Sequence, residues 1–217
     1  PLNPAAKVYE RSELEAIART CQEADLLAIV DAVYEHLTFD GRKHLPLASL
    51  PGMMERTLTI GSAGSIFSAT GWKVGWVTGP AALVKLVAKA HQFMTFTTPP
   101  NLQVAVAYGL DEWDVWISGL KRVMQEKRDH LAVGLAAAGM KVLPSHGTYF
   151  LNVALDGTKW AGRDADYCQH ITEKNRVAAI PLSAFYMDRP ATSTARFCFA
   201  KKPDVLDGAI ARLKSVS

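Results

Sequence analysis

Two charged residues lie in or directly after apolar segments that are typical of strands. Asp31 directly follows the apolar run of residues 26–30, and Arg196 lies inside the apolar segment 194–199. A carboxylate at the end of a strand can cap a turn or bind a ligand, and both roles stay open for Asp31. An arginine within an apolar strand needs an anionic partner or an edge position. We therefore expect Arg196 to bind either the carboxylate of a ligand or a structural acidic residue, on the strand face opposite to Ala195 and Cys198.

Further polar residues follow predicted strands. Tyr34 comes three residues after Asp31, and Ser62 and Gly64 come after the strand-like segment 57–60. Open α/β sheets bind ligands at the carboxyl ends of their strands, so these residues are candidates for one site. The alternative is a purely structural role, in which Ser62 and Gly64 only form a tight turn.

Spacing excludes several other kinds of site. A GxSxG nucleophile motif centred on Ser62 would need glycine at position 60, which is Ile60. The chain contains neither GxxxxGK[ST] nor GxGxxG, the glycine-rich loops that bind nucleotide phosphates. The six histidines lack the i, i+4 pairing of a zinc-binding helix, and we expect no metal site.

Composition indicates an ordinary globular protein. The 217 residues are 49% hydrophobic and 21% charged, enough for one large domain or two small ones. A net charge of +3 is too small to predict nucleic-acid or anionic-membrane binding, and no apolar run approaches a membrane span. Three cysteines without a CxxC pair indicate a reducing compartment, so we expect a cytoplasmic protein. Because the chain opens at Pro1 without an initiator methionine, we expect any targeting segment to lie upstream.

The elements that would position these residues alternate in type over residues 1–110. Helical spacing predicts a helix over 10–24, followed by a strand over 26–30 that is apolar enough to be buried on both faces. Residues 57–60 and 74–77 predict two further strands. This alternation favours a doubly wound α/β layer with a mostly parallel sheet and helices on both faces.

A second, smaller α/β unit is expected over residues 111–217. It begins with a long helix over 112–138, which Gly139 ends. Strand patterns follow at 141–143, 148–153 and 194–199, and a closing helix is centred on 205–213. We find no repeats or long linkers.

Six segments together resemble class I, fold type I aminotransferases, which depend on pyridoxal 5′-phosphate (PLP). The most specific is Gly61-Ser62-Ala63-Gly64-Ser65-Ile66-Phe67-Ser68-Ala69-Thr70-Gly71-Trp72-Lys73-Val74-Gly75-Trp76, which is similar to the family signature S-x-G-K…TGW[KR]xG. The others are Asn3-Pro4-Ala5-Ala6-Lys7-Val8, Asp31-Ala32-Val33-Tyr34-Glu35, Thr98-Pro99-Pro100-Asn101-Leu102-Gln103, Gly147-Thr148-Tyr149-Phe150 and Ala195-Arg196-Phe197-Cys198-Phe199-Ala200-Lys201. The resemblance covers essentially the whole chain as the C-terminal half of such an enzyme. It is strongest to the kynurenine/glutamine-type enzymes and their bacterial relatives.

The resemblance implies five cofactor-binding residues. Asp31 would pair with the protonated pyridine nitrogen of PLP, which keeps the ring electron-accepting. Tyr34 and Asn3 would hydrogen-bond its phenolic oxygen. Ser62 and Lys73 would contact its phosphate, with Lys73 as a point charge where many relatives carry arginine.

The resemblance also implies a substrate-binding residue and one departure. Arg196 would clamp the α-carboxylate of an amino acid in a two-bond geometry. Ser65 stands at the position of the family's Schiff-base lysine, since the intervals to Ser62 and Lys73 are preserved. Serine can neither form the covalent bond to PLP nor act as the lysine's proton-transferring amine. Ala6, where relatives usually carry glycine, is a milder departure.

Three functions stay open from the sequence. The first is an aminotransferase that exchanges an amino group between an amino acid and a 2-oxo acid, impaired by Ser65 and by the missing N-terminal half. The second is a PLP-dependent β-lyase acting on cysteine conjugates, and the third is a non-catalytic remnant that binds PLP or a partner. The family also implies a homodimer in the full-length form, with neither nucleic acid nor membrane as a partner.

Overall fold

The computed structural model describes residues 1–188, 190 and 192–214 and divides into two compact units. The first unit consists of Pro1 and Val8–Leu120, and the second consists of Leu2–Lys7 and Lys121–Ser217. Each unit combines helices with one sheet, so the expected α/β class is confirmed. The two units are described in turn.

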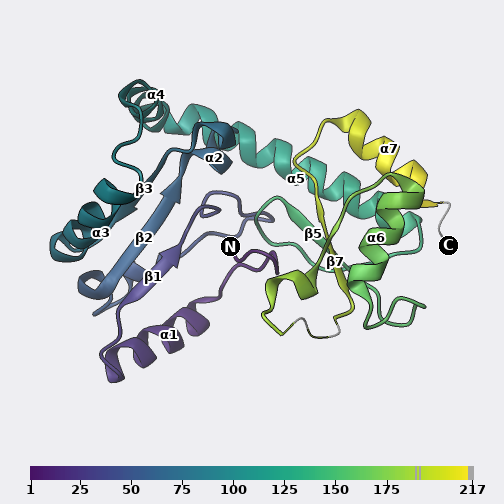
Figure 1. Cartoon of the computed structure of the whole chain (residues 1–217), viewed down its shortest axis with the longest axis horizontal. Helices are drawn as coiled ribbons and strands as arrows, with labels where there is room; N and C mark the ends of the chain where they lie inside the picture. The colour runs from purple at the N-terminus through teal and green to yellow at the C-terminus, as the bar shows by residue number, and fades with distance from the viewer. Residues whose placement is uncertain (189, 191, 215–217) are drawn as a thin grey trace. The chain divides into compact units, whose positions relative to one another are not determined.

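The first unit contains a three-stranded mixed sheet. Its strands β1 (Ala28–Asp31), β2 (Thr57–Ser62) and β3 (Gly75–Thr78) lie in that order, visible in Figure 1. Strands β1 and β2 are parallel, whereas β2 and β3 are antiparallel. Because β1 and β2 run in the same direction, their carboxyl ends meet at the same edge of the sheet.

The burial expected for the strand at 26–30 is wrong. Strand β1 begins at Ala28, and its side chains alternate between half-buried and exposed, with Ile29 71% exposed. Ala28 and Val30 pack against the cluster that contains Leu14 of α1, which covers one face only. An apolar run predicts a strand, but it does not tell whether a second layer covers the strand's other face.

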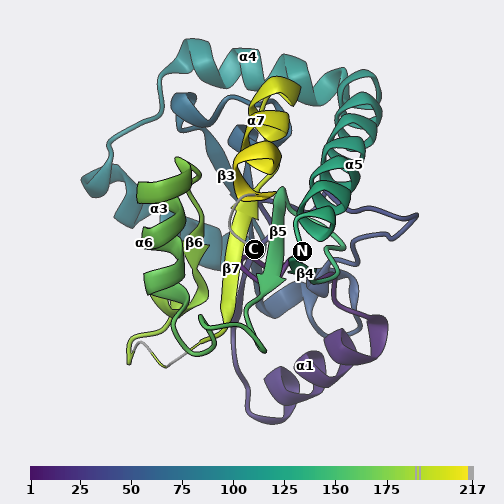
Figure 2. The same cartoon turned by 90° about the vertical axis from the view of Figure 1, so that its right-hand side faces the viewer.

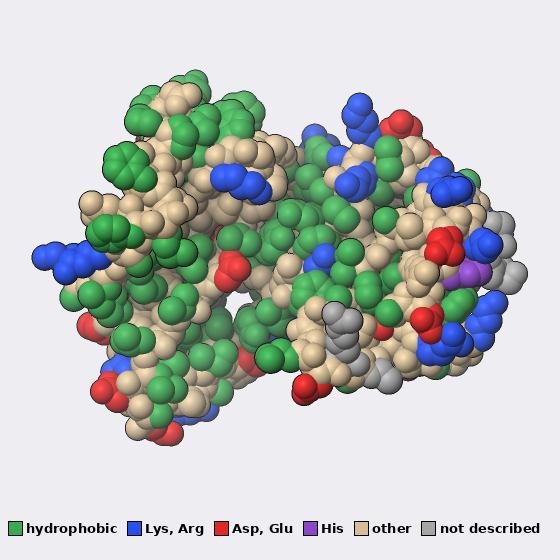
Figure 3. All heavy atoms as spheres, in the orientation of Figure 1, with side chains coloured by type: hydrophobic (Ala, Val, Ile, Leu, Met, Phe, Trp, Pro, Cys, Tyr) green, Lys and Arg blue, Asp and Glu red, His purple; other side chains and the backbone are tan. Residues whose placement is uncertain are grey.

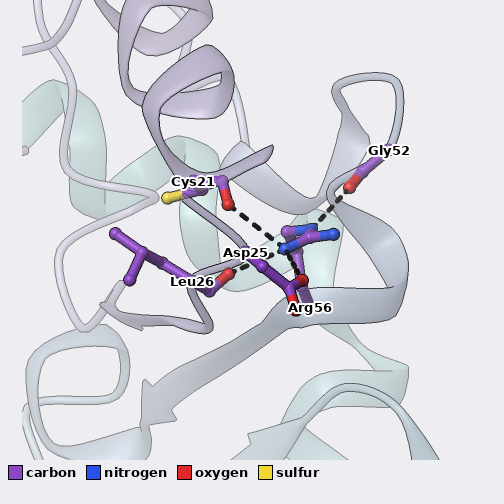
Figure 4. A network of polar contacts seen from close by, with 5 residues as sticks. All are labelled: Cys21, Asp25, Leu26, Gly52 and Arg56. Atoms are coloured by element: carbon purple, nitrogen blue, oxygen red, sulfur yellow. Dashed lines mark hydrogen bonds and ion pairs between the residues drawn. The ribbon is translucent and has the colours of Figure 1, made fainter. Parts of the chain in front are cut away.

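Helix α1 (Arg11–Glu23) covers the inner face of β1 and is held at both ends. Its first turn carries a reciprocal capping box between Glu10 and Glu13. At its other end Arg56 donates hydrogen bonds to the carbonyls of Cys21 and Leu26, and pairs with Asp25 at 3.1 Å (Figure 4). One guanidinium therefore fixes the end of α1 beside the start of β2.

The remaining helices of the first unit are short or exposed. Helix α2 (Ala63–Ile66) follows β2 at once, and α3 (Ala81–Met94) and α4 (Pro100–Asp111) follow β3. None of the residues of α3 is buried, and Figure 3 shows hydrophobic side chains at the surface over α3 and α4. Short 3₁₀ turns occupy Leu47–Ser49, Met54–Arg56 and Thr70–Trp72.

The second unit contains a four-stranded antiparallel sheet. Its order is β4 (Lys141–Val142), β5 (Phe150–Ala154), β7 (Thr194–Cys198) and β6 (Ile180–Pro181), and Figure 2 shows β7 between β5 and β6. All five residues of β5 are buried. The strands expected at 141–143, 148–153 and 194–199 are confirmed with shifted ends.

Three helices accompany this second sheet. The long helix α5 (Trp113–Ala137) is the one predicted over 112–138, and Gly139 follows it at φ +81°, where glycine is favoured. Helix α6 (Asp164–Asn175) has no counterpart in the sequence prediction, whereas α7 (Pro203–Leu213) confirms the closing helix. A 3₁₀ turn, η4 (Leu182–Phe185), lies between β6 and β7. Leu131, Leu135 and Leu213 are among the fully buried side chains of this unit.

Candidate functional site

Asp31 lies at the carboxyl end of β1, where its carboxylate is exposed. Its Oδ1 atom accepts a hydrogen bond from the backbone N–H of Val33 at 3.2 Å, which fixes the turn after the strand. Tyr34 is half-buried in that same turn, and its carbonyl accepts from the N–H of Leu37 at 2.9 Å. The structure therefore places Asp31 and Tyr34 on one turn at the end of one strand.

Ser62 ends β2 and begins α2. Its hydroxyl oxygen accepts a hydrogen bond from the N–H of Gly64 at 3.1 Å and so caps the short helix. The tight turn expected from Ser62 and Gly64 is present. Because β1 and β2 are parallel, with Asp31 paired opposite Ile60, Ser62 and Asp31 lie at the same edge of the sheet.

Ser65 is on α2, and its side chain is tied to the turn that follows Asp31. The Ser65 hydroxyl donates to the carbonyl of Val33 at 2.5 Å. The N–H of the same residue, Val33, donates to Asp31. The backbone of Val33 thus connects the two side chains, and no sequence pattern singles out this residue.

Lys73 lies just before β3, and the strand pairing holds it close to Ser62. Ser62 is opposite Gly75 in the antiparallel ladder, and the carbonyl of Val74 accepts from the N–H of Ala63 at 3.0 Å. Lys73 itself is exposed and adopts φ +56°, a left-handed conformation that costs a non-glycine residue about 1–2 kcal/mol.

Gly61 allows the two strands of this region to approach each other. A Cβ atom added to it would lie 2.2 Å from Nε1 of Trp76, its partner across the ladder. The indole of Trp76 in turn packs against the cluster of Ala63, Val74 and Val106. A side chain at position 61 would therefore disturb the junction between β2 and α2.

A titratable pair follows Tyr34 directly. Nε2 of His36 lies 3.2 Å from a carboxylate oxygen of Glu35, and this hydrogen bond lowers the pKa of Glu35. His36 also packs edge-on against the ring of Trp113, with 4.1 Å between centroids. Burial lowers the pKa of the neighbouring His44. Glu35, His36 and Trp113 line a cavity of about 340 Å³ together with Trp76 and Leu110.

Arg196 and Asn3 meet in the second unit. Nη1 of Arg196 donates to the side-chain oxygen of Asn3, 193 positions away in the sequence. The guanidinium also lies over two aromatic rings, 3.9 Å from the centroid of Phe150 and 4.9 Å from that of Phe185. The electron-rich faces of the two rings attract the positive charge of Arg196 and so favour this orientation of its guanidinium. Neither Phe150 nor Phe185 was singled out as a site residue from the sequence.

The strand face of Arg196 differs in part from the expectation. Ala195 and Phe197 are buried on one face of β7, whereas Thr194, Arg196 and Cys198 are half-buried on the other. Placing Cys198 opposite Arg196 was wrong, because residues two apart in a strand share a face.

The turn that carries Asn3 belongs to the second unit. The N–H of Leu2 donates to the carbonyl of Lys7 at 2.7 Å, and the N–H of Ala6 donates to the carbonyl of Leu2 at 2.8 Å. Ala6 adopts φ +55°, the left-handed region that favours glycine. A third bond, from the N–H of His146 to the carbonyl of Ala6 at 2.8 Å, joins the turn to the rest of the unit.

Residues 1–188, 190 and 192–214 contain no group of three or more His, Cys, Asp or Glu side chains that could hold a metal ion. None of the helices in this part of the chain combines the length and apolarity that crossing a membrane requires.

Comparison with known proteins gives consistent matches along the chain. Residues 1–213 match the profile of the family described as aminotransferase class I and II. A probable N-succinyldiaminopimelate aminotransferase of Mycobacterium tuberculosis is 44% identical, covering 98% of this chain and 56% of the relative. The human kynurenine–oxoglutarate transaminase 1 is 37% identical, covering 99% and 56%.

The fold of the chain also matches that of a solved aminotransferase structure. The structure of N-succinyldiaminopimelate aminotransferase from M. tuberculosis superposes with a TM-score of 0.94 at 44% identity, covering 100% of this chain and 56% of that one. The chain therefore spans about half the length of the relatives it matches.

Proposed function

Because the chain belongs to the class I and II aminotransferase family, we propose that it binds PLP and serves amino-group exchange between an amino acid and a 2-oxo acid, at a rate impaired by Ser65. One observation carries this proposal. The carboxylate of Asp31 and the hydroxyl of Ser65 are joined through the backbone of Val33 at the carboxyl end of β1.

The donors and acceptors of the first unit have the chemistry that PLP requires. Asp31 presents an exposed carboxylate, suited to hold a proton on the pyridine nitrogen, and Tyr34 lies on the same turn. Ser62 and Lys73 offer a hydroxyl and an ammonium group, which suit a phosphate, and the ladder between β2 and β3 holds their segments together. In the second unit, Asn3 offers an amide to the phenolic oxygen. When bound, PLP supplies an acceptor for the electrons released at the substrate Cα atom.

Ser65 does not fit the covalent role of the family lysine. It offers no amine, and its hydroxyl proton is engaged by the carbonyl of Val33. A neutral serine is a poor base near pH 7, so the side chain at this position would not move the Cα proton. We propose that PLP is held only by non-covalent contacts in this chain.

Arg196 is the proposed substrate-binding residue. Its guanidinium is pre-oriented by Phe150, Phe185 and Asn3, which lowers the entropy cost of a two-bond contact with a carboxylate. Since amino acids and 2-oxo acids both carry a carboxylate beside the reacting carbon, one arginine serves both substrates.

A second candidate function is PLP binding without turnover. The bond between Ser65 and Val33 favours it, because the residue at the lysine position is part of the local scaffold. The remaining parts of the proposal follow the family: residues 1–110 as the end of a PLP-binding large domain, residues 111–217 as a small domain, a homodimer, and a location in the cytoplasm.

Restoring the lysine tests the function. Ser65→Lys, made in the natural polypeptide that contains these 217 residues, is compared with the unchanged protein on a panel of amino acids and 2-oxo acids. Proton transfer by a positioned group contributes roughly 10²–10⁴-fold, so amino-group exchange should rise by at least the lower figure. If amino-group exchange is undetectable in the unchanged protein and appears only in the variant, the second candidate function, PLP binding without turnover, is favoured for the unchanged chain. If the lysine variant binds PLP and stays inert on the whole panel, the aminotransferase proposal fails.

A further inference from the structure

Asn152 is a polar residue in the most buried strand of the second unit. It lies on β5, whose other members are Phe150, Leu151, Val153 and Ala154, and it is only 4% exposed. We propose that Asn152 is a positioning residue, which holds the turn carrying Asn3 against the guanidinium of Arg196. The importance of this placement for substrate binding rests on the function proposed above.

The strand register brings Asn152 next to Arg196. The two residues are direct partners in the antiparallel ladder of β5 and β7. Directly opposed residues point to the same face, with Cβ atoms about 4.5–5.5 Å apart. Phe150, two residues before Asn152, shares that face, in agreement with its ring lying 3.9 Å from the guanidinium.

The amide of Asn152 connects this face to the turn of residues 2–7. Its Nδ2 atom donates to the carbonyl of Pro4 at 2.8 Å. The residue before Pro4 is Asn3, whose side-chain oxygen accepts from Arg196. Strand pairing and two hydrogen bonds therefore form a closed path from Asn152 through Pro4 and Asn3 to Arg196 and back to Asn152.

The side-chain oxygen of Asn152 argues against a role in which this residue only fills space in the core. The Oδ1 atom of Asn152 is buried and accepts no hydrogen bond from any described residue. The orientation of the amide is nevertheless defined, because only the NH₂ group can donate to the carbonyl of Pro4. Leaving a buried acceptor unsatisfied is unfavourable, and a leucine of similar volume would avoid that cost. The contact that leucine cannot replace is the bond to Pro4.

Loss of this bond would free one end of the turn only. The N–H of His146 still holds the carbonyl of Ala6, so the turn would stay attached while Asn3 moves away from Arg196. Misplacing a binding group by about 1 Å can cost on the order of a hundredfold. We expect Asn152→Leu to weaken carboxylate binding at Arg196 by roughly tenfold or more.

The experiment compares variants on the two faces of β5. Asn152→Leu removes the donor to Pro4, and Asn152→Ser replaces it with a hydroxyl that is one bond shorter than the amide of the 2.8 Å contact. Val153→Ala opens a cavity on the opposite, fully buried face. Two quantities are measured in each protein. One is the ¹⁵N relaxation of the Arg196 Nε–H group, assigned by its loss in Arg196→Lys, and the other is the Kd for 3-phenylpropionate, a carboxylate that cannot react.

In both Asn152 variants we expect faster motion of the Arg196 Nε–H group and weaker binding of 3-phenylpropionate. Val153→Ala should show neither change, although we expect its melting temperature to lie below that of the unchanged protein. Unchanged Arg196 relaxation in the Asn152 variants, or the same loosening in Val153→Ala, would overturn the proposal. If Asn152→Leu does not fold, Asn152→Ser decides by the same readouts. If Arg196 loosens as predicted but the unchanged protein does not bind the carboxylate, the positioning role holds and the proposed function fails instead.

Discussion

Gly61→Ala is expected to destabilise the first unit by displacing Trp76. The added Cβ would lie 2.2 Å from Nε1, 2.3 Å from Cε2 and 2.7 Å from Cζ2 of the indole. Since ordinary contact between such atoms begins at about 3.5 Å, the ring has to move by roughly 1.3 Å. The ring packs against Ala63, Val74 and Val106, so its movement disturbs these contacts.

The size of the effect follows from this overpacking. Inserting one methyl group into a packed region typically costs about 1–3 kcal/mol, and moving a tryptophan places this variant near the upper end. Ser62 follows Gly61 directly and pairs with Gly75, so the affinity for PLP should fall as well. The expected loss is therefore about 2–3 kcal/mol in the free energy of unfolding, with weaker PLP binding.

Urea unfolding followed by tryptophan fluorescence measures this change. Gly71→Ala is the matched control, because a Cβ at Gly71 meets nothing within 4 Å, and surface changes of this kind stay within about 0.5 kcal/mol. Equal stability of the Gly61 and Gly71 variants, with an unchanged fluorescence spectrum, would refute the packing argument.

Two further predictions concern the second unit. In the Ser65→Lys protein, Arg196→Lys should raise the KM for both the amino acid and the 2-oxo acid and leave the PLP content unchanged. The reason is that lysine cannot form the paired, two-bond contact with a carboxylate. A lower melting temperature with an unchanged KM would make Arg196 purely structural. Burial raises the pKa of the Cys168 thiol to about 12, so only about one thiol in 10⁴ is ionised at pH 8. Iodoacetamide should therefore modify half-buried Cys198 well before Cys168, as peptide mass spectrometry would show, and equal rates would contradict this order.

Periodicity predicted the elements whose boundaries carry strong local signals. Helix α1 was found because apolar residues recur at helical spacing between Glu10 and Ala24, and α5 because Gly139 marks its end. Helix α3 was missed because it begins after Pro80 without a polar capping side chain, so its start carries no local signal. The direction of β3 was missed because strand patterns do not specify parallel or antiparallel pairing.

The candidate site divides in a similar way. Asp31 and Arg196 were identified because charge stands out against apolar neighbours. Val33 takes part only through its backbone N–H and carbonyl, which a side-chain pattern cannot reveal. Asn152 did carry a signal, a polar residue in an apolar strand, but its partner Pro4 lies 148 positions away.

Borohydride reduction tests the central claim most directly. The protein is incubated with one equivalent of PLP, reduced, digested and analysed by mass spectrometry beside Ser65→Lys. We predict that the unchanged protein carries no pyridoxyl group at position 65 or at Lys73, and that the variant carries one at position 65. A stable adduct on Lys73 of the unchanged protein, or its absence from position 65 of the variant, would contradict the placement of Ser65 at the lysine position.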